Sequence, residues 1–126
     1  MTEAERVVEG APSIEALEAQ ARQKPDDIGA LRELGWAHYG RGQTEQAIEV
    51  FRRATERFSE DSESFYGLGL SLVKLGGQEQ AATQAFEQAV QLADSIPGKI
   101  RAEMLRKLAQ GHINQLDHGS WDIRAL

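Results

Sequence analysis

Apolar residues recur three to four positions apart along most of the chain, the spacing that places them on one face of an α-helix. Short polar or glycine-containing segments interrupt this pattern and divide the chain into predicted helices. No segment alternates β-branched or aromatic residues with polar ones, so no β-sheet is predicted. The pattern therefore predicts an all-α fold. The predicted helices cover about residues 14–24, 28–39, 45–58, 63–75, 79–93 and 99–115.

Turn residues mark the predicted helix ends. Ser13 and Thr44 are expected to cap the helices that follow them, because a hydroxyl at this position accepts a hydrogen bond from a first-turn amide. Pro25 with the two aspartates after it should end one helix and cap the next. Gly42 should end another, since glycine readily takes the left-handed conformation common at helix ends.

The two central helix pairs share one pattern of small and large residues. A repeat of this kind, with a period of about 34 residues, predicts a solenoid of stacked helical hairpins. Leu105, Leu108, Ala109 and His112 match the first-helix stripe of the second unit at an offset of 40 residues. The shared positions are Leu34, Gly35, Gly42, Ala47, Phe51 and Ala54 in the first unit, and Leu68, Gly69, Gly76 or Gly77, Ala82, Phe86 and Ala89 in the second.

The repeat gives a predicted division of the chain. Residues 1–12 should be a flexible polar lead, and residues 13–126 a single helical domain. Within this domain we expect full repeats at about 28–61 and 62–97, with partial units at 13–27 and 98–126.

This pattern resembles the tetratricopeptide repeat (TPR) family over about Ile14 to Leu116, and the Pro25 turn is of the kind that this family uses between repeats. The resemblance implies a right-handed α-solenoid of antiparallel helical hairpins that binds proteins or peptides. Three positions depart from it, since His38, Leu72 and His112 replace the tyrosine usual after the Leu-Gly pair. Some members of this family clamp the C-terminal carboxylate of chaperones. Trp36 and Leu70 stand where that clamp would need asparagines, which argues against it.

Composition excludes several other functions. The formal net charge of -6, without a long basic run, is a poor match for nucleic acid, whose phosphates must be neutralised. The chain has no cysteine, no apolar segment of membrane-spanning length and no signal-peptide pattern at its start. We therefore expect a cytoplasmic protein without membrane insertion.

No catalytic or metal-binding motif is recognisable in the sequence. The only histidines are His38, His112 and His118, and the first two fall on the predicted buried stripe, where a packed, hydrogen-bonded role is expected. Neither a phosphate-binding loop nor an activated nucleophile is present. We therefore predict no enzyme activity and no cofactor.

A partner-binding groove is predicted on the first helix of each unit, because first helices line the concave face of such an array. The stripe beside the buried one offers aromatic and aliphatic side chains with basic groups at the edges, which suits a peptide with apolar anchors and some acidic character. The alternative for Trp36, Tyr39 and Tyr66 is packing between helices. The candidate groove residues are Arg32, Trp36, Tyr39, Tyr66, Leu70, Val73, Lys74, Arg106, Gln110, Ile113 and Asn114.

Self-association is the second functional hypothesis. The predicted helix from residue 99 to 115 lacks a full partner helix, and the ends of a solenoid need polar caps. Residues after Gly119 could fold back as a cap, or could dock on a second copy to build a homo-oligomeric scaffold. The residues assigned to this surface are Met104, Leu108, Trp121, Ile123 and Leu126.

Overall fold

The computed structural model of the protein describes residues 12–121, which contain α-helices and one short 3-10 helix but no strand. The all-α prediction is confirmed. The helices are α2 (Ile14–Gln23), α3 (Ile28–Gly40), α4 (Thr44–Arg57), α5 (Ser62–Leu75), α6 (Glu79–Leu92), η1 (Ala93–Ser95) and α7 (Lys99–His118).

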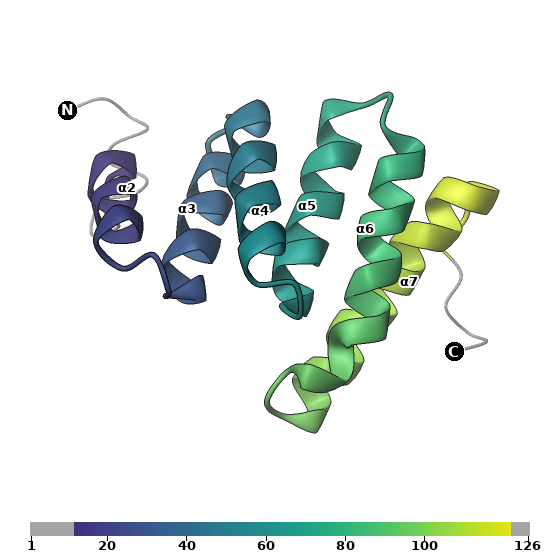
Figure 1. The fold of residues 1–126 in the computed structure, drawn as a ribbon. Coiled ribbons are helices and arrows are strands. Elements are labelled where there is room, and N and C mark those ends of the chain that lie inside the picture. Colours follow the sequence, from purple (N-terminus) through teal and green to yellow (C-terminus); the bar gives the residue numbers. More distant parts are fainter. Residues whose placement is uncertain (1–11, 122–126) are drawn as a thin grey trace.

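The helices stand side by side in chain order and form a solenoid of antiparallel hairpins (Figure 1). Each helix packs mainly against its neighbours in the sequence, and contacts also join α3 to α5 and α5 to α7. These two additional contacts bring the first helices of successive units together. The right-handed sense of the array stays a prediction.

Side chains cap three of the helices. Ser13 accepts from the amide of Ala16, Asp27 from that of Gly29, and Asp61 from that of Ser64. The cap predicted for Thr44 is wrong. Thr44 is already inside α4, and the residue before it makes no side-chain cap. Helix α7 extends beyond its predicted end to His118. Gly119, whose φ is 69°, ends it.

Two fully buried phenylalanines fill the centre of the array, and glycines make room for their rings. A Cβ placed on Gly35 would lie 2.7 Å from the ring of Phe51, and one on Gly67 would lie 2.5 Å from the same ring. A Cβ on Gly69 would likewise lie 2.7 Å from the ring of Phe86. A side chain at these glycines would therefore force neighbouring helices apart.

The same relation recurs in the third unit, at an unexpected position. Gly111 of α7 faces the ring of Trp121 so closely that a Cβ would overlap it. Gly35, Gly69 and Gly111 are thus equivalent, each covered by an aromatic ring that follows in the chain. The third unit is offset by 42 residues from the second, and the predicted offset of 40 is wrong. A shift of two residues turns a helix face by about 200°.

Candidate partner-binding surface

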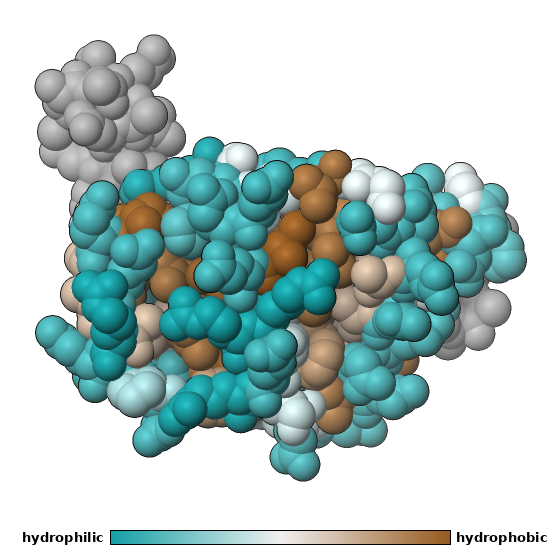
Figure 2. All heavy atoms as spheres, turned by 45° about the horizontal axis from the view of Figure 1, so that its top comes forward, coloured by the Kyte–Doolittle hydropathy of each residue, from teal (hydrophilic) through white to brown (hydrophobic). Residues whose placement is uncertain are grey.

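Apolar side chains reach the surface in separate patches surrounded by polar ones (Figure 2). Several hollows interrupt this surface. They differ in how polar their linings are, as two of them show.

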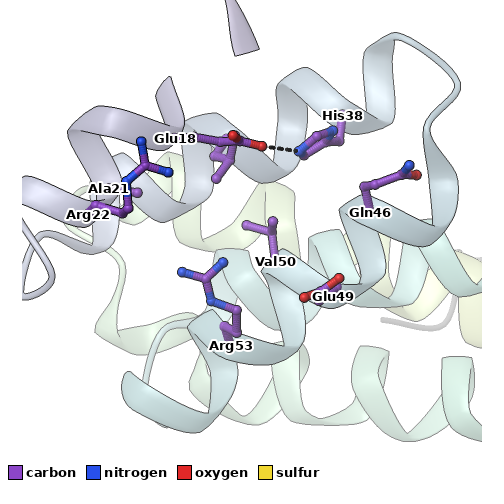
Figure 3. Close-up of a pocket in the computed structure, with 9 residues that line it drawn as sticks. Glu18, Ala21, Arg22, His38, Gln46, Glu49, Val50 and Arg53 are labelled. Atoms are coloured by element: carbon purple, nitrogen blue, oxygen red, sulfur yellow. Dashed lines mark ion pairs between the residues drawn. The ribbon is translucent and has the colours of Figure 1, made fainter. Parts of the chain in front are cut away.

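One hollow, of about 280 Å³, lies between α2, α3 and α4 and has a mixed-charge lining (Figure 3). Arg22 and Arg53 contribute two positive charges. Glu18 and Glu49 contribute two negative ones, and Glu18 lies 3.9 Å from the ring of His38. Most residues of this lining are charged or polar, so this hollow is a poor match for the large apolar anchors of protein interfaces.

A second hollow, of about 260 Å³, lies where the first helices α3, α5 and α7 meet. Trp36 comes from α3, Tyr66 from α5, and Leu108 from α7, so three units contribute to one site. Its wall is mostly apolar, with one carboxylate and one guanidinium. The lining residues are Trp36, Glu63, Tyr66, Ile96, Arg101, Met104, Leu105 and Leu108.

The aromatic rings of this hollow are fixed by packing against the core. Trp36 meets Phe51 edge-on, with 5.0 Å between ring centroids and 70° between ring planes. Tyr66 is tilted against Phe86 at 5.8 Å. Both rings are half-buried. The two interpretations of these aromatics are therefore compatible, since each ring packs on the core and also lines the hollow.

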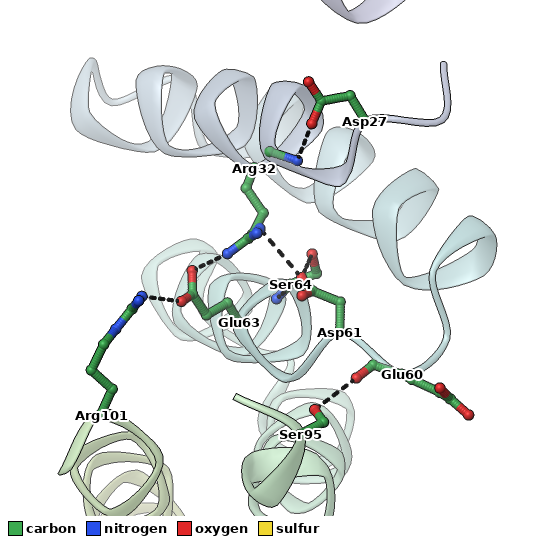
Figure 4. Close-up of polar contacts among 9 residues, drawn as sticks. Asp27, Arg32, Glu60, Asp61, Glu63, Ser64, Ser95 and Arg101 are labelled. Atoms are coloured by element: carbon green, nitrogen blue, oxygen red, sulfur yellow. Dashed lines mark hydrogen bonds and ion pairs between the residues drawn. The ribbon is translucent and has the colours of Figure 1, made fainter. Parts of the chain in front are cut away.

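A chain of charged groups crosses the three helices beside the hollow (Figure 4). Glu63 of α5 accepts from Arg32 of α3 at 2.5 Å and from Arg101 of α7 at 2.8 Å. Asp61 adds a contact to Nε of Arg32 at 3.6 Å. This Arg32–Glu63–Arg101 ladder links the first helices, and together with Asp61 it has balanced charges.

The other groove residues predicted on α3 and α5 do not line the hollow. Tyr39, Leu70, Val73 and Lys74 lie nearer the C-terminal ends of their helices. Lys74 lies 4.6 Å from the centroid of the Tyr39 ring and donates to the carbonyl oxygen of Tyr39 at 3.3 Å. This contact joins α3 to α5 at the end opposite to the ladder.

The groove placement predicted for Ile113 is wrong, because this side chain is only 7% exposed and packs in the core. The other three residues predicted on α7 do not line the hollow either. Arg106 pairs with Asp94 and Glu103, and Gln110 donates to Asn114 at 3.1 Å. The two-residue register difference accounts for all four placements, because it turns the predicted face away from the hollow.

The α7 residues that do line the hollow were assigned differently by the sequence. Leu105 was placed on the buried stripe, and Met104 and Leu108 on a separate surface for self-association. Arg101, Ile96 and Glu63 are not among the predicted groove residues. The contact of Gly111 with Trp121 is the relation that aligns α7 correctly. Sequence spacing alone does not single it out, because Trp36 and Tyr39 lie between Gly35 and its ring.

Trp121 folds back on α7. Its ring meets His112 edge-on at 4.5 Å and covers Gly111, although the side chain stays 42% exposed. Among the residues predicted for self-association, Trp121 is therefore engaged within its own chain. Ile123 and Leu126 lie outside the described residues.

His112 belongs to an aromatic cluster in this region. Its ring stacks on Phe86, with 4.7 Å between centroids and 8° between planes, and Nε2 lies 3.4 Å from the hydroxyl of Tyr66. Burial lowers the pKa of His112. Burial, with a smaller effect of Tyr39, raises the pKa of Tyr66.

His38 is buried, and its Nδ1 lies 2.8 Å from Oε1 of Gln43, the packed and hydrogen-bonded role expected for it. Residues 12–121 contain no group of three histidine or acidic side chains arranged to hold a metal ion. Within the same residues, no helix is both long and apolar enough to cross a membrane.

Comparison with known proteins agrees with the repeat pattern and the stacked hairpins. A family model described as tetratricopeptide repeat matches residues 8–59 and 32–97. The chain is also 31% identical over 91 residues to Protein CTR9 homolog of Arabidopsis thaliana. This match covers 72% of the chain but 8% of the plant protein, so the chain spans a small part of that relative. From its sequence, its fold and this match, the chain belongs to the tetratricopeptide repeat family.

Proposed function

We propose that this chain binds a protein partner through the hollow between α3, α5 and α7, as an adaptor or assembly factor. Tetratricopeptide repeats generally mediate protein–protein interaction. The observation that supports this site is the meeting of Trp36, Tyr66 and Leu108 from three units in one mostly apolar hollow. A partner would insert an apolar side chain there, and large apolar anchors of this kind provide most of the affinity of many interfaces.

The packing of the site favours binding without rearrangement. Trp36 and Tyr66 are held against buried phenylalanines, and the ladder through Glu63 links the three helices. A surface that is already ordered loses less conformational freedom when a partner docks. That the chain has no enzyme activity remains a prediction. Its cytoplasmic location remains a prediction as well.

The proposal can be tested with a displayed library of random peptides selected on the intact chain. Leu108→Glu places a charge in the hollow, while Leu75→Glu makes the same change at a residue of similar exposure outside it (41% and 43% exposed). We expect selected peptides to lose at least tenfold in affinity for Leu108→Glu and to keep it for Leu75→Glu. Peptides that bind both variants like the parent would contradict the proposed site.

Self-association is the competing function, because Met104 and Leu108 are exposed on α7. It is tested by the solution mass of the chain over a range of concentrations. A constant mass near 13.9 kDa supports binding of a different protein. A rise in mass that Leu108→Glu abolishes would make a homo-oligomeric scaffold the function of this surface.

A further inference from the structure

An apolar strip continues from the hollow along α7. Ile100, Met104 and Leu108 follow one another at intervals of four residues, so they share one face of the helix. Their side chains are 78%, 58% and 41% exposed, in that order. Met104 and Leu108 line the hollow and Ile100 does not, so the strip extends beyond it by one helical turn.

The strip lies at the projecting end of the array. The lower end of α6 and the start of α7 extend past the ends of the preceding helices (Figure 1). Eight residues separate Ile100 from Leu108, which corresponds to about 12 Å along a helix. A straight apolar strip of this length matches the ridge that residues four apart form on a second helix.

Basic side chains flank this strip. Arg101 lies on one side and Lys107 on the other, as follows from about 100° of rotation per residue. Helix α7 has four basic side chains and two acidic ones, and it is the only one of helices α2–α7 with a net positive charge, in a chain of net charge -6. Arg101 pairs with Glu63 and Lys107 with Glu103, but the Arg101 and Lys107 side chains remain 66% and 48% exposed, so a partner's carboxylates can reach both.

We propose that the strip binds an amphipathic helix whose apolar ridge is flanked by acidic side chains. This inference rests on the proposed function and specifies the partner of that site. The partner's ridge would contact Ile100 and Met104 and enter the hollow near Leu108. Its carboxylates would meet Arg101 and Lys107, where charge complementarity speeds association and determines selectivity.

The charge on α7 argues against a second copy as the occupant. Antiparallel pairing of two α7 helices centred on Met104 would bring the two copies of Arg101 onto one flank of the interface and the two copies of Lys107 onto the other. Such like-charge pairs oppose association. An acidic helix makes the same apolar contacts and gains attraction at both flanks.

Two synthetic peptides of about 16 residues test the inference by fluorescence anisotropy on the intact chain. Both have leucines every three to four residues on one face. Glutamates flank this face in one peptide and lysines in the other. We expect the glutamate peptide to bind at least tenfold more tightly than the lysine peptide, with an affinity that falls as salt increases. A lysine peptide that binds equally well would overturn the inference.

Variants then locate the contact. Ile100→Glu should weaken the glutamate peptide at least tenfold, while Leu75→Glu leaves it unchanged. The double variant Arg101→Glu/Lys107→Glu should reverse the preference between the two peptides. Unchanged binding to Ile100→Glu would overturn the strip as the contact surface. The substituted side chains are exposed, so we expect the variants to remain folded, and circular dichroism checks this.

The outcomes separate this inference from the proposed function. If library peptides depend on Leu108 but show no acidic preference and no effect of Ile100→Glu, the hollow is the site and the strip is not. If the glutamate peptide depends on Ile100 but not on Leu108, the strip binds without the hollow. A concentration-dependent mass that Ile100→Glu abolishes would show a second copy on the strip and would overturn the proposal of an acidic helix.

Discussion

The ring of Trp121 covers the backbone of Gly111, in the relation that Phe51 has to Gly35. In the first unit 16 residues separate the glycine from its ring, whereas in the third unit only 10 do. Phe51 reaches its glycine from a complete second helix, and Trp121 from the segment just after α7. In both units an aromatic ring thus fills the space above the glycine, but the ring comes from a different kind of chain segment in each.

This difference predicts that alanine substitution destabilises the fold at Gly69 but hardly at Gly111. Gly69→Ala drives a methyl group into the fully buried Phe86, so we expect the free energy of unfolding to fall by about 1–3 kcal/mol. Gly40→Ala is the control, because it is helical and a Cβ there meets nothing within 4 Å. Urea denaturation followed by circular dichroism measures both. Equal effects of the two variants would contradict the packing described for Phe86.

Gly111→Ala should behave differently, because its neighbouring ring is free to move away. The variant gains about 1 kcal/mol of helix propensity and displaces Trp121 instead of a core residue. We expect almost unchanged unfolding together with a red-shifted tryptophan emission. Trp36→Phe in the same background leaves Trp121 as the only indole and assigns the shift. An unshifted emission would show that Trp121 does not lie on Gly111.

The ladder across the first helices leads to a prediction on Glu63. Its carboxylate accepts from both Arg32 and Arg101, and the side chain is only 24% exposed. Glu63→Gln removes the charge but keeps the shape, so we expect a loss of about 1 kcal/mol that shrinks at high salt. Glu60→Gln is the matched control, because that residue is exposed and only its backbone carbonyl accepts a described hydrogen bond. A loss independent of salt would contradict an electrostatic role for Glu63.

The sequence predicted most of the fold because its period is carried by residues that the core requires. Gly35 and Gly69 admit Phe51 and Phe86, so spacing alone located both central hairpins. The third unit lacked such a constraint. As an apolar pattern, Leu105, Leu108 and Ala109 align best with Phe65, Leu68 and Gly69. The contact of Gly111 with Trp121 aligns them instead with Glu63, Tyr66 and Gly67. That contact depends on a turn whose path the pattern does not specify.

The site was predicted only in part, because the first two units were aligned correctly and the third was not. Trp36 and Tyr66 come from correctly aligned helices and do line the hollow. Ile113 was placed there through the wrong register and is buried instead. Ile96 could not be found from periodicity, because it lies in the irregular segment between η1 and α7 and not on a helix face.

Buried serines give a further prediction that distinguishes two similar hydroxyls. The hydroxyl of Ser62 donates to the carbonyl of Ala89 at 2.6 Å, in the last turn of α6. The amide of Ala93, four residues after Ala89, donates to the carbonyl of Val90 and not to that of Ala89. Ser62→Ala removes a partner of this carbonyl, and we expect a loss of about 1 kcal/mol in the free energy of unfolding.

Ser71 is the matched comparison. Its hydroxyl donates to the carbonyl of Gly67, four residues earlier on α5. This carbonyl is also the acceptor of the α-helical backbone bond from the amide of the same residue. Ser71→Ala should therefore have little effect on stability. Chemical denaturation of both variants checks the difference, and a larger loss for Ser71→Ala than for Ser62→Ala would contradict it.

The last prediction concerns pH. Burial against Phe86 and Trp121 lowers the pKa of His112 from its ordinary value near 6.5, so the folded chain favours the neutral ring. Below pH 6.5 the unfolded chain binds a proton before the folded chain does. Stability from this group is therefore complete above pH 6.5 and is lost as the pH falls toward the folded pKa. Tyr66 faces the same ring, but its raised pKa keeps it protonated throughout this range.

Denaturation curves between pH 7 and pH 5 measure this effect as a slope of unfolding free energy against pH. His112→Gln should reduce the slope, because the residue that titrates differently in the two states is gone. His118→Gln is the control, since that side chain is exposed and lies outside the aromatic cluster. We expect it to keep the parental slope. If both variants kept that slope, burial of His112 would have no measurable energetic consequence, which would contradict the prediction.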